Sequence, residues 1–277
     1  MPVPEPIRAA AAAAPSAGIR TLARFGFAAI GVVYGLMGLL ALLAATGQRG
    51  GSTTSKEQAV QRLQDLPGGA VLLGLMAFGL LGYVVWRFTQ AIMDTESKGS
   101  GAKGLGRRLG YAGSGVFYAG LALYTGRLAV QGSAEEGGAD ASQSLTARVL
   151  AWPGGSWLVL AVGLVVIGIG VYQVIKAYAG QFEKDVNASG LSAGQQQLVH
   201  RAGQVGFTAR GLVLGLIGFF FAQAGWQARA GAVGGTAEVF DLLARMGPLV
   251  LGVVAAGLIA YGLFMLVQAR YPVLRGV

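Results

Sequence analysis

The stretch RFGFAAIGVVYG at residues 24–35 begins an apolar segment that continues to Thr46 and is long enough to cross a lipid bilayer. Related stretches follow twice: RLGYAGSGVFYA at residues 108–119 and QVGFTARGLVLG at residues 204–215. Each copy has a glycine at its third position and then a glycine at its eighth, followed by three residues, mostly apolar, and a small one. This recurrence predicts a helical membrane protein built from repeats.

Six apolar stretches of the chain have a length suited to crossing about 30 Å of hydrocarbon as helices. A transmembrane strand needs about ten residues of alternating character, and no such pattern is visible, so we expect an all-α membrane protein. The first stretch is too long for a signal peptide, which indicates a retained helix. The six expected transmembrane helices cover approximately Phe25–Thr46, Gly69–Met93, Leu109–Val130, Ser156–Ala179, Gln204–Ala224 and Gly247–Ala269.

The second helices of the units also repeat, as WRFTQA at residues 86–91, YQVIKA at residues 172–177 and FMLVQA at residues 264–269. Each unit therefore holds two spans, and successive units enter the membrane in the same orientation. Such repeats are related by an axis along the membrane normal. We expect three tandem two-helix repeats in a pseudo-threefold arrangement. The repeats are placed at residues 20–96, 104–183 and 198–271, after a flexible cytoplasmic tail at residues 1–19.

The composition agrees with a membrane protein and excludes several classes of site. Hydrophobic residues make up 54% of the chain and charged residues only 12%, against about 25% charged residues in soluble domains. Because the chain has no Cys and a single His, thiolate and multi-histidine metal sites are excluded. The chain has a net charge of +9. Its Lys and Arg residues are unevenly distributed, with thirteen on the side of the membrane that holds the termini and seven on the other side. This asymmetry predicts a multi-pass protein of a bacterial cytoplasmic membrane with both termini in the cytoplasm.

The external connections carry a further repeated pattern, at Ser55–Leu66, Ala141–Trp152 and Thr236–Arg245. Each mixes small, polar and apolar residues at helical spacing. We expect a short interfacial helix before each second span. The alternative is a polar loop with a few apolar residues.

The paired spans, the repeated Gly-apolar-apolar-Tyr-small motif and the ending YGLFMLVQAR at residues 261–270 resemble a bacterial membrane family, the domain of unknown function numbered 1206. The resemblance covers about Arg20 to Tyr271 and implies three copies of one module, without implying an activity. The family commonly has Ala-Arg-Gly in the first helix. Only residues 209–211 keep this motif, while residues 29–31 and 113–115 depart from it, which argues against a threefold ring of arginines.

Recurrent small residues four positions apart mark the first helices. Because lipid supplies no hydrophobic force between helices, small residues let backbones approach closely and gain dispersion energy. We interpret these glycines as helix-packing positions; the alternative is a role as hinges or as pore-lining backbone. The glycines concerned are Gly31, Gly35, Gly115, Gly211 and Gly215.

Arg210 is the basic residue that lies deepest inside a predicted span, ~10 Å from its cytoplasmic edge. The other basic residues of the spans, Arg87, Arg127 and Lys176, lie near helix ends. A charge at the depth of Arg210 is costly and requires a partner or water. None of the spans contains an Asp or Glu, so the partner must be a carbonyl, a Gln, a tyrosine hydroxyl, a lipid phosphate or a bound anion. Two interpretations remain open: Arg210 extends to the cytoplasmic surface, or it belongs to a site for an anion or lipid headgroup.

A second polar set recurs near the cytoplasmic end of each second helix. We interpret these residues as anchors at the headgroup level. The alternative is that the three equivalent polar groups line a vestibule around the axis. With Arg210, this set forms the candidate polar or anion site: Arg87, Gln90, Gln173, Lys176 and Gln268.

The sequence carries no motif for catalysis, since no acid and base converge in any span. Accordingly, we expect no catalytic residues, no metal site and no cofactor, and the chain lacks the aromatic-interleaved basic patches of nucleic-acid binders. The favoured function is a non-enzymatic scaffold or lipid-binding module, with membrane lipids, including anionic headgroups, as partners. The alternative is a small-solute or anion pathway along the pseudo-threefold axis.

Overall fold

A computed structural model of the chain describes residues 17–47, 60–64, 68–93, 101–132, 139–187 and 190–273. Within these ranges the regular structure is helical, apart from one isolated antiparallel bridge between Val186 and Pro272. The prediction of an all-α protein is confirmed. Of the expected tail at residues 1–19, residues 1–16 lie outside the described residues, and the first helix already begins at Ala17.

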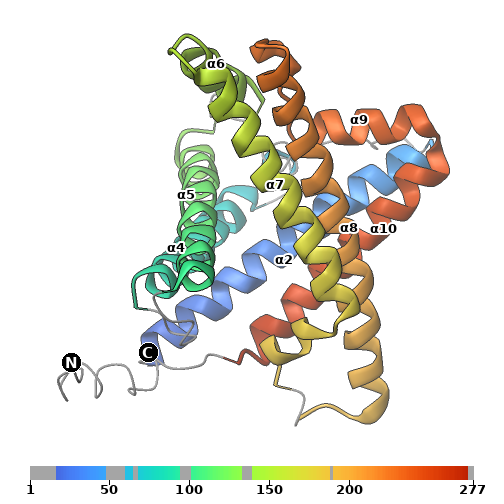
Figure 1. Cartoon of the computed structure of the whole chain (residues 1–277). Helices are drawn as coiled ribbons and strands as arrows, with labels where there is room; N and C mark the ends of the chain where they lie inside the picture. Colours follow the sequence, from blue (N-terminus) through green and yellow to red (C-terminus); the bar gives the residue numbers. More distant parts are fainter. Residues whose placement is uncertain are drawn as a thin grey trace, which may run out of the picture.

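Six long helices form the bundle in Figure 1. Five of them are long and apolar enough to cross a membrane. The helix α5 spans the expected third crossing, but its glycine, tyrosine and serine residues make it less apolar than the others, so the number of six crossings stays a prediction. The long helices are α2 (Ala17–Ala45), α4 (Gly69–Met93), α5 (Ala102–Gln131), α7 (Gly155–Tyr178), α8 (Ala193–Trp226) and α10 (Pro248–Arg270).

The bundle has two distinct ends. We call the end at which α2 begins and α10 ends the inner end, and the opposite one the outer end (Figure 1). Two short helices precede second spans at the outer end: α6 (Ala139–Leu150) before α7, and α9 (Thr236–Met246) before α10. In Figure 1, α9 lies across the direction of the long helices. In the first repeat, the corresponding segment is described only over residues 60–64.

The most extensive helix contacts join the first helix of one repeat to the second helix of the preceding repeat. The pairs are α5 with α4, α8 with α7, and, closing the cycle, α2 with α10. Because the same relation occurs three times, the pairing follows the expected pseudo-threefold pattern. The most extensive helix contacts are therefore made between repeats and not between the two helices of one repeat.

Glycines create two of these three contacts. A Cβ atom added to Gly170 would lie 2.6 Å from the carbonyl oxygen of Gly211, and one added to Gly211 would lie 2.7 Å from that of Gly170. The equivalent positions in α2 and α10 match closely, since a Cβ atom on Gly262 would lie 2.7 Å from the oxygen of Gly31. Real side chains do not tolerate such distances, so the backbones touch because the side chains are missing.

The other packing glycines take related positions. Gly35 and Gly215 have open space where their own Cβ atoms would be, but their backbone nitrogens lie 2.8 and 2.7 Å from Cβ atoms built on Gly262 and Gly170. In the remaining pair, the space beside Gly115 is occupied by the ring of Phe88, 3.1 Å from its ideal Cβ position.

A second type of contact lies within a repeat, and only two of its three copies are formed. The helix α2 packs on α4, and α8 packs on α10. A Cβ atom added to Gly26 would lie 2.8 Å from the backbone nitrogen of Tyr83. One added to Gly206 would lie 2.6 Å from the backbone nitrogen of Tyr261. The equivalent helices α5 and α7 do not pack along each other, and Gly110 has open space where its Cβ atom would be.

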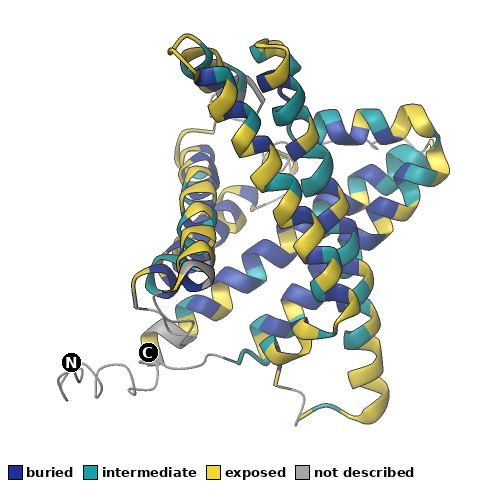
Figure 2. Cartoon of the chain, in the orientation of Figure 1, coloured by how far each residue is buried: buried dark blue, intermediate teal, exposed yellow. Residues whose placement is uncertain are grey.

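Burial follows from this incomplete ring. In Figure 2 the central helices α2 and α10 carry continuous buried faces, whereas α7 is exposed over most of its length outside the face that meets α8. A bilayer would cover such apolar exposed faces, because lipid tails are as apolar as the side chains.

We expect Gly170→Ala to destabilise the bundle by about 1–3 kcal/mol, the usual range for forcing extra atoms into a packed site. The added methyl group would collide with the backbone of α8 at Gly211. The matched control is Gly168→Ala on the same helix, where a Cβ atom meets open space and helix propensity is gained. Thermal unfolding in detergent measures both, and an equal effect of the two substitutions would contradict the assigned contact.

Candidate functional site: two arginines among tyrosines

Arg210 lies on α8 in the inner half of the bundle and points to three other long helices. Its Nε donates to the hydroxyl of Tyr34 at 3.2 Å, and its Nη1 donates to the hydroxyl of Tyr261 at 2.9 Å and to Oε1 of Gln173 at 3.1 Å. These partners come from α2, α10 and α7. Of the partners expected from sequence, the structure provides a Gln and tyrosine hydroxyls, so the side chain is held inside the bundle.

Aromatic rings complete the surroundings of Arg210. Its guanidinium carbon is 4.9 Å from the ring centroid of Tyr261 and 5.7 Å from that of Tyr34. These two rings meet edge to face, with centroids 4.8 Å apart. Negative ring faces stabilise a cation that has few waters around it. The Arg210 guanidinium is thus surrounded by uncharged hydrogen-bond acceptors and by aromatic rings.

Arg87 on α4 has a similar environment. Its Nε donates to the hydroxyl of Tyr83 at 2.6 Å and its Nη1 to Oε1 of Gln90 at 3.0 Å. The guanidinium also lies over the ring of Tyr111 from α5, 5.3 Å from the centroid. The two hydrogen bonds of Arg87 therefore stay within α4, and its contact with α5 is made through the ring of Tyr111.

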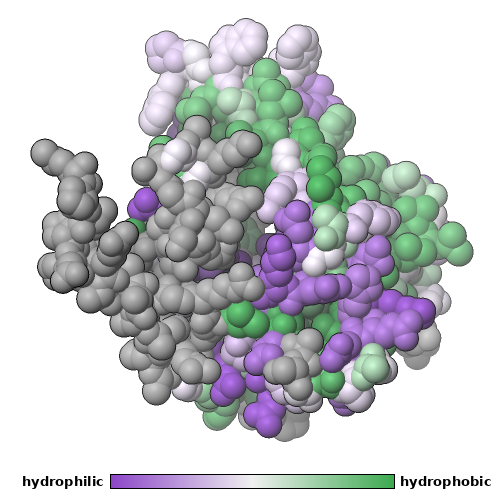
Figure 3. Space-filling model, turned by 60° about the horizontal axis from the view of Figure 1, so that its bottom comes forward, coloured by the Kyte–Doolittle hydropathy of each residue, from purple (hydrophilic) through white to green (hydrophobic). Residues whose placement is uncertain are grey.

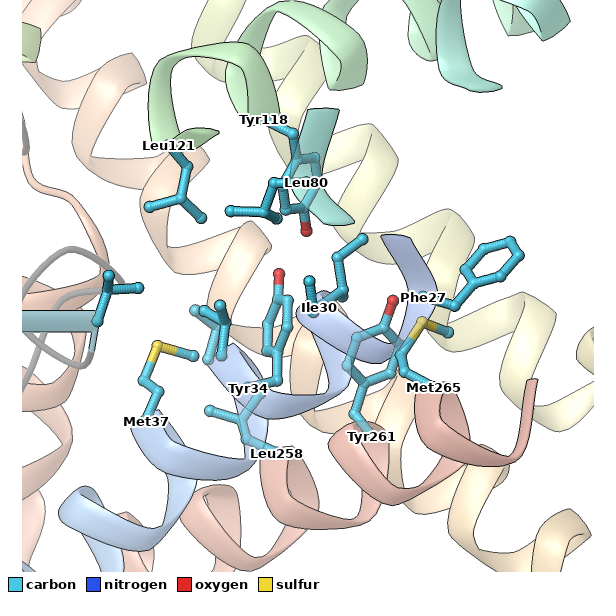
Figure 4. Packing of buried hydrophobic residues seen from close by; sticks show 14 of the residues in the cluster. Phe27, Ile30, Tyr34, Met37, Leu80, Tyr118, Leu121, Leu258, Tyr261 and Met265 are labelled. Carbon is cyan, nitrogen blue, oxygen red and sulfur yellow. The ribbon is translucent and has the colours of Figure 1, made fainter. Parts of the chain in front are cut away.

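Tyr118 joins the two arginine environments into one cluster. It is 2% exposed, and its ring packs edge to face against the ring of Tyr83 with centroids 4.9 Å apart. Figure 4 shows the hydroxyls of Tyr118 and Tyr34 pointing toward each other from α5 and α2, with the hydroxyl of Tyr261 beside them. We call the two arginines and their tyrosine and glutamine neighbours the arginine–tyrosine cluster.

The positive charge of this cluster is not neutralised within the described part of the bundle. The six long helices contain no Asp or Glu. In addition, Nη2 of Arg87 and Nη2 of Arg210 make no hydrogen bond to any described residue. Two guanidinium groups with unused donors and neutral partners are suited to binding an anion, because Arg presents its donors in the planar fork that fits carboxylate and phosphate.

Two members of the predicted polar set lie apart from the cluster. Lys176 forms a 2.7 Å ion pair with Asp185 just beyond the end of α7, and its ammonium lies 4.8 Å from the centroid of Phe207. Gln268 is buried on α10 and is not bonded to either arginine in the described part of the chain. Of the predicted set, the structure thus pairs Arg87 with Gln90 and Arg210 with Gln173.

Sequence reasoning missed Tyr83 and Tyr261 as members of the site. They occupy equivalent positions in their repeats, and Tyr83 lies one helical turn before Arg87. The equivalent residue of the second repeat is Ile169, which is exposed. In an alignment of the second helices, Tyr83 and Tyr261 share the position one turn before Arg87 and its equivalents, and this shared position would have identified both tyrosines.

The departures from the Ala-Arg-Gly motif leave a single arginine at this level of the first helices. The residue equivalent to Arg210 in the first repeat is Ile30, 1% exposed in the apolar core, and in the second repeat it is Ser114. The ring of three equivalent positions is therefore chemically asymmetric.

Toward the outer end, apolar side chains close the bundle beyond the cluster. This layer is almost completely buried, with each side chain at most 2% exposed: Met37, Leu73, Leu128, Leu251 and Leu258. Figure 4 shows Met37 and Leu258 beside Tyr34. The two arginines of the cluster thus lie on the inner side of this apolar layer.

Other titratable groups lie outside the cluster. His200 contacts the Glu183 carboxylate near the inner end, where both side chains are partly exposed. Among the described residues, His, Asp and Glu do not gather in groups of three that suit a metal ion.

A double-mutant cycle tests how Arg210 is held. We expect Gln173→Leu to cost about 1.5–3 kcal/mol, the range for a hydrogen bond to a charged group, because it removes an acceptor from the guanidinium. In an Arg210→Met background the same substitution should cost much less, since the charge is absent. Unfolding in detergent measures all four proteins, and equal costs in both backgrounds would contradict the contact.

Comparisons with known proteins assign the chain to a family. A family model described as "Domain of Unknown Function (DUF1206)" matches residues 25–94, 109–180 and 205–272. The chain is also 32% identical over 255 residues to "Uncharacterized protein YxxB" of Bacillus subtilis (strain 168), covering 91% of each chain. No solved structure matches. The three matches confirm the tandem repeats, and the chain belongs to the DUF1206 family.

Proposed function

We propose that the protein is a non-enzymatic membrane module that binds the anionic headgroup of a lipid at the arginine–tyrosine cluster. The observation that carries this proposal is the pair of guanidinium groups, Arg87 and Arg210, held by neutral partners in a bundle whose long helices lack carboxylates. An uncompensated charge in a membrane-spanning segment is costly and is a mark of function.

The location of the cluster supports a ligand that approaches from the inner end. Arg87 and Arg210 are only partly buried, whereas the tyrosines Tyr34, Tyr83 and Tyr261 around them are at most 4% exposed. Figure 3 looks toward the inner end and shows hydrophilic residues gathered from the centre to the right of that face. A headgroup at this face would meet the guanidinium donors without crossing the apolar core.

The apolar layer at the outer end favours a binding site over a continuous pathway. An anion that crossed the bundle would have to pass Met37, Leu73 and Leu251, which leave almost no exposed surface. Moving a charge through such a layer requires either water or polar groups. A binding site on the inner side of this apolar layer fits the position of the two guanidinium groups better than a pore does.

The proposal is tested by thermal unfolding of the protein in nanodiscs of phosphatidylcholine with and without phosphatidylglycerol. Phosphatidylglycerol should stabilise the wild type, since a ligand at about one hundred times its Kd adds ~2.7 kcal/mol. Arg210→Gln should lose this stabilisation. The matched control is Arg201→Gln, an exposed residue of the same helix with the same change in charge, which should retain it.

Two arms separate the alternatives. Inorganic phosphate and glycerol phosphate test for soluble anions; stabilisation by either to the same extent as phosphatidylglycerol would contradict a lipid ligand. Liposomes loaded with anions test for transport; efflux that requires the wild-type protein and is lost in Arg210→Ala would contradict the binding module and favour the pathway. Equal stabilisation of wild type and Arg210→Gln by phosphatidylglycerol would also overturn the proposal.

A further inference from the structure

The pseudo-threefold bundle lacks one of its interfaces. Within the first and third repeats, the two long helices pack on each other, but α5 and α7 of the second repeat do not. On α5, Gly110 and Gly113 have no atom within 4 Å of their ideal Cβ positions, and the same is true of Gly168 on α7. Leu109 and Val165 are 65% and 62% exposed. The two helices thus leave unpacked apolar faces at the side of the bundle, and we call the space between these faces the gap.

The sequence contains a physical reason for this gap. In the first repeat, a Cβ atom on Gly79 would lie 2.7 Å from the carbonyl oxygen of Phe25, whereas a Cβ atom on its equivalent Gly257 would collide with the side chain of Ala209. The second repeat has Val165 at this position. A valine would collide with the backbone of α5 at Leu109 if the helices met as in the first repeat. The interface within the second repeat therefore cannot close with the geometry of the first.

The gap adjoins the arginine–tyrosine cluster. The helix α5 contributes Tyr111 and Tyr118 to this cluster, and α7 contributes Gln173, the acceptor for Arg210. The same two helices that fail to meet therefore both reach the cationic groups. A molecule lying between them would have apolar walls along its length and guanidinium donors at its inner end.

We infer that the gap between α5 and α7 holds an acyl chain of a phospholipid whose anionic headgroup binds at Arg87 and Arg210. The inference rests on the proposed function for the headgroup and adds the route by which the lipid tail leaves the bundle. Charge complementarity selects this occupant. A phosphate neutralises the two guanidinium groups, and an acyl chain covers Leu109 and Val165 without requiring polar partners.

Cysteine cross-linking tests whether the gap is open in a membrane. The chain has no native cysteine, so engineered pairs have no background. The pair Gly113→Cys with Val165→Cys occupies the positions equivalent to Ala29 and Gly79, and it should stay reduced under oxidation. The control pair Ala77→Cys with Gly126→Cys joins α4 to α5 with ideal Cβ atoms 3.9 Å apart, a distance suited to a disulfide, and it should cross-link.

Filling the gap tests whether lipid occupies it. The substitution Val165→Trp should reduce the phosphatidylglycerol retained on the purified protein, counted by native mass spectrometry, about tenfold. Leu164→Trp is the control, because Leu164 is exposed on a neighbouring face of α7, and it should retain the wild-type amount. Monodisperse elution of both variants establishes that they fold.

The outcomes are distinguishable. A disulfide between positions 113 and 165 within one chain, formed as readily as the control disulfide, shows that the ring closes and overturns the inference. A disulfide between chains assigns the gap to a second copy and also overturns it, as does equal lipid retention by Val165→Trp and Leu164→Trp. If Arg210→Gln loses lipid but Val165→Trp does not, the headgroup site stands and only the lateral route fails.

Discussion

The backbone contact between glycines of neighbouring repeats positions the rest of the molecule. In a bilayer, helices gain little by hiding apolar side chains from lipid, so close packing and dispersion must hold them together. Arg210 precedes the contact glycine Gly211, and Tyr261 precedes Gly262. Because the glycines bring the helix axes close, these polar side chains reach one another across the bundle. The cluster depends on the same contacts that determine the fold.

A threefold framework thus carries an asymmetric site. Equivalent positions of the second helices hold Arg87, Gln173 and Met265, so one becomes a cation, one an acceptor for Arg210, and one part of the apolar core. A symmetric ring of arginines would place like charges close together without compensation. Because the repeats have diverged, the third repeat supplies the charged Arg210 and the second repeat supplies its hydrogen-bond acceptor, Gln173.

Several levels of this organisation could be predicted from the sequence. Apolar length and glycine recurrence were sufficient for the helices, the repeats and the family, because these properties are local. The partners of Arg210 were not, because Tyr34 lies 176 residues away along the chain and nothing local specifies which helices pair. Lys176 illustrates the same limit, since its pairing with Asp185 depends on how the chain turns after α7. One long-range feature could be predicted: the alignment of Val165 with Gly79 and Gly257 indicates that the packing of α5 on α7 is missing.

The pairing of α2 with α10 also affects how the bundle is assembled. Because α2 is synthesised before its principal partner α10, the face of α2 around Gly31 has no contact with Gly262 until more than two hundred intervening residues have been made. Hairpins formed early hold only their within-repeat contacts, and in the second repeat even that contact is missing. Completion of the bundle is therefore a late, long-range event rather than the sum of three independently folded modules.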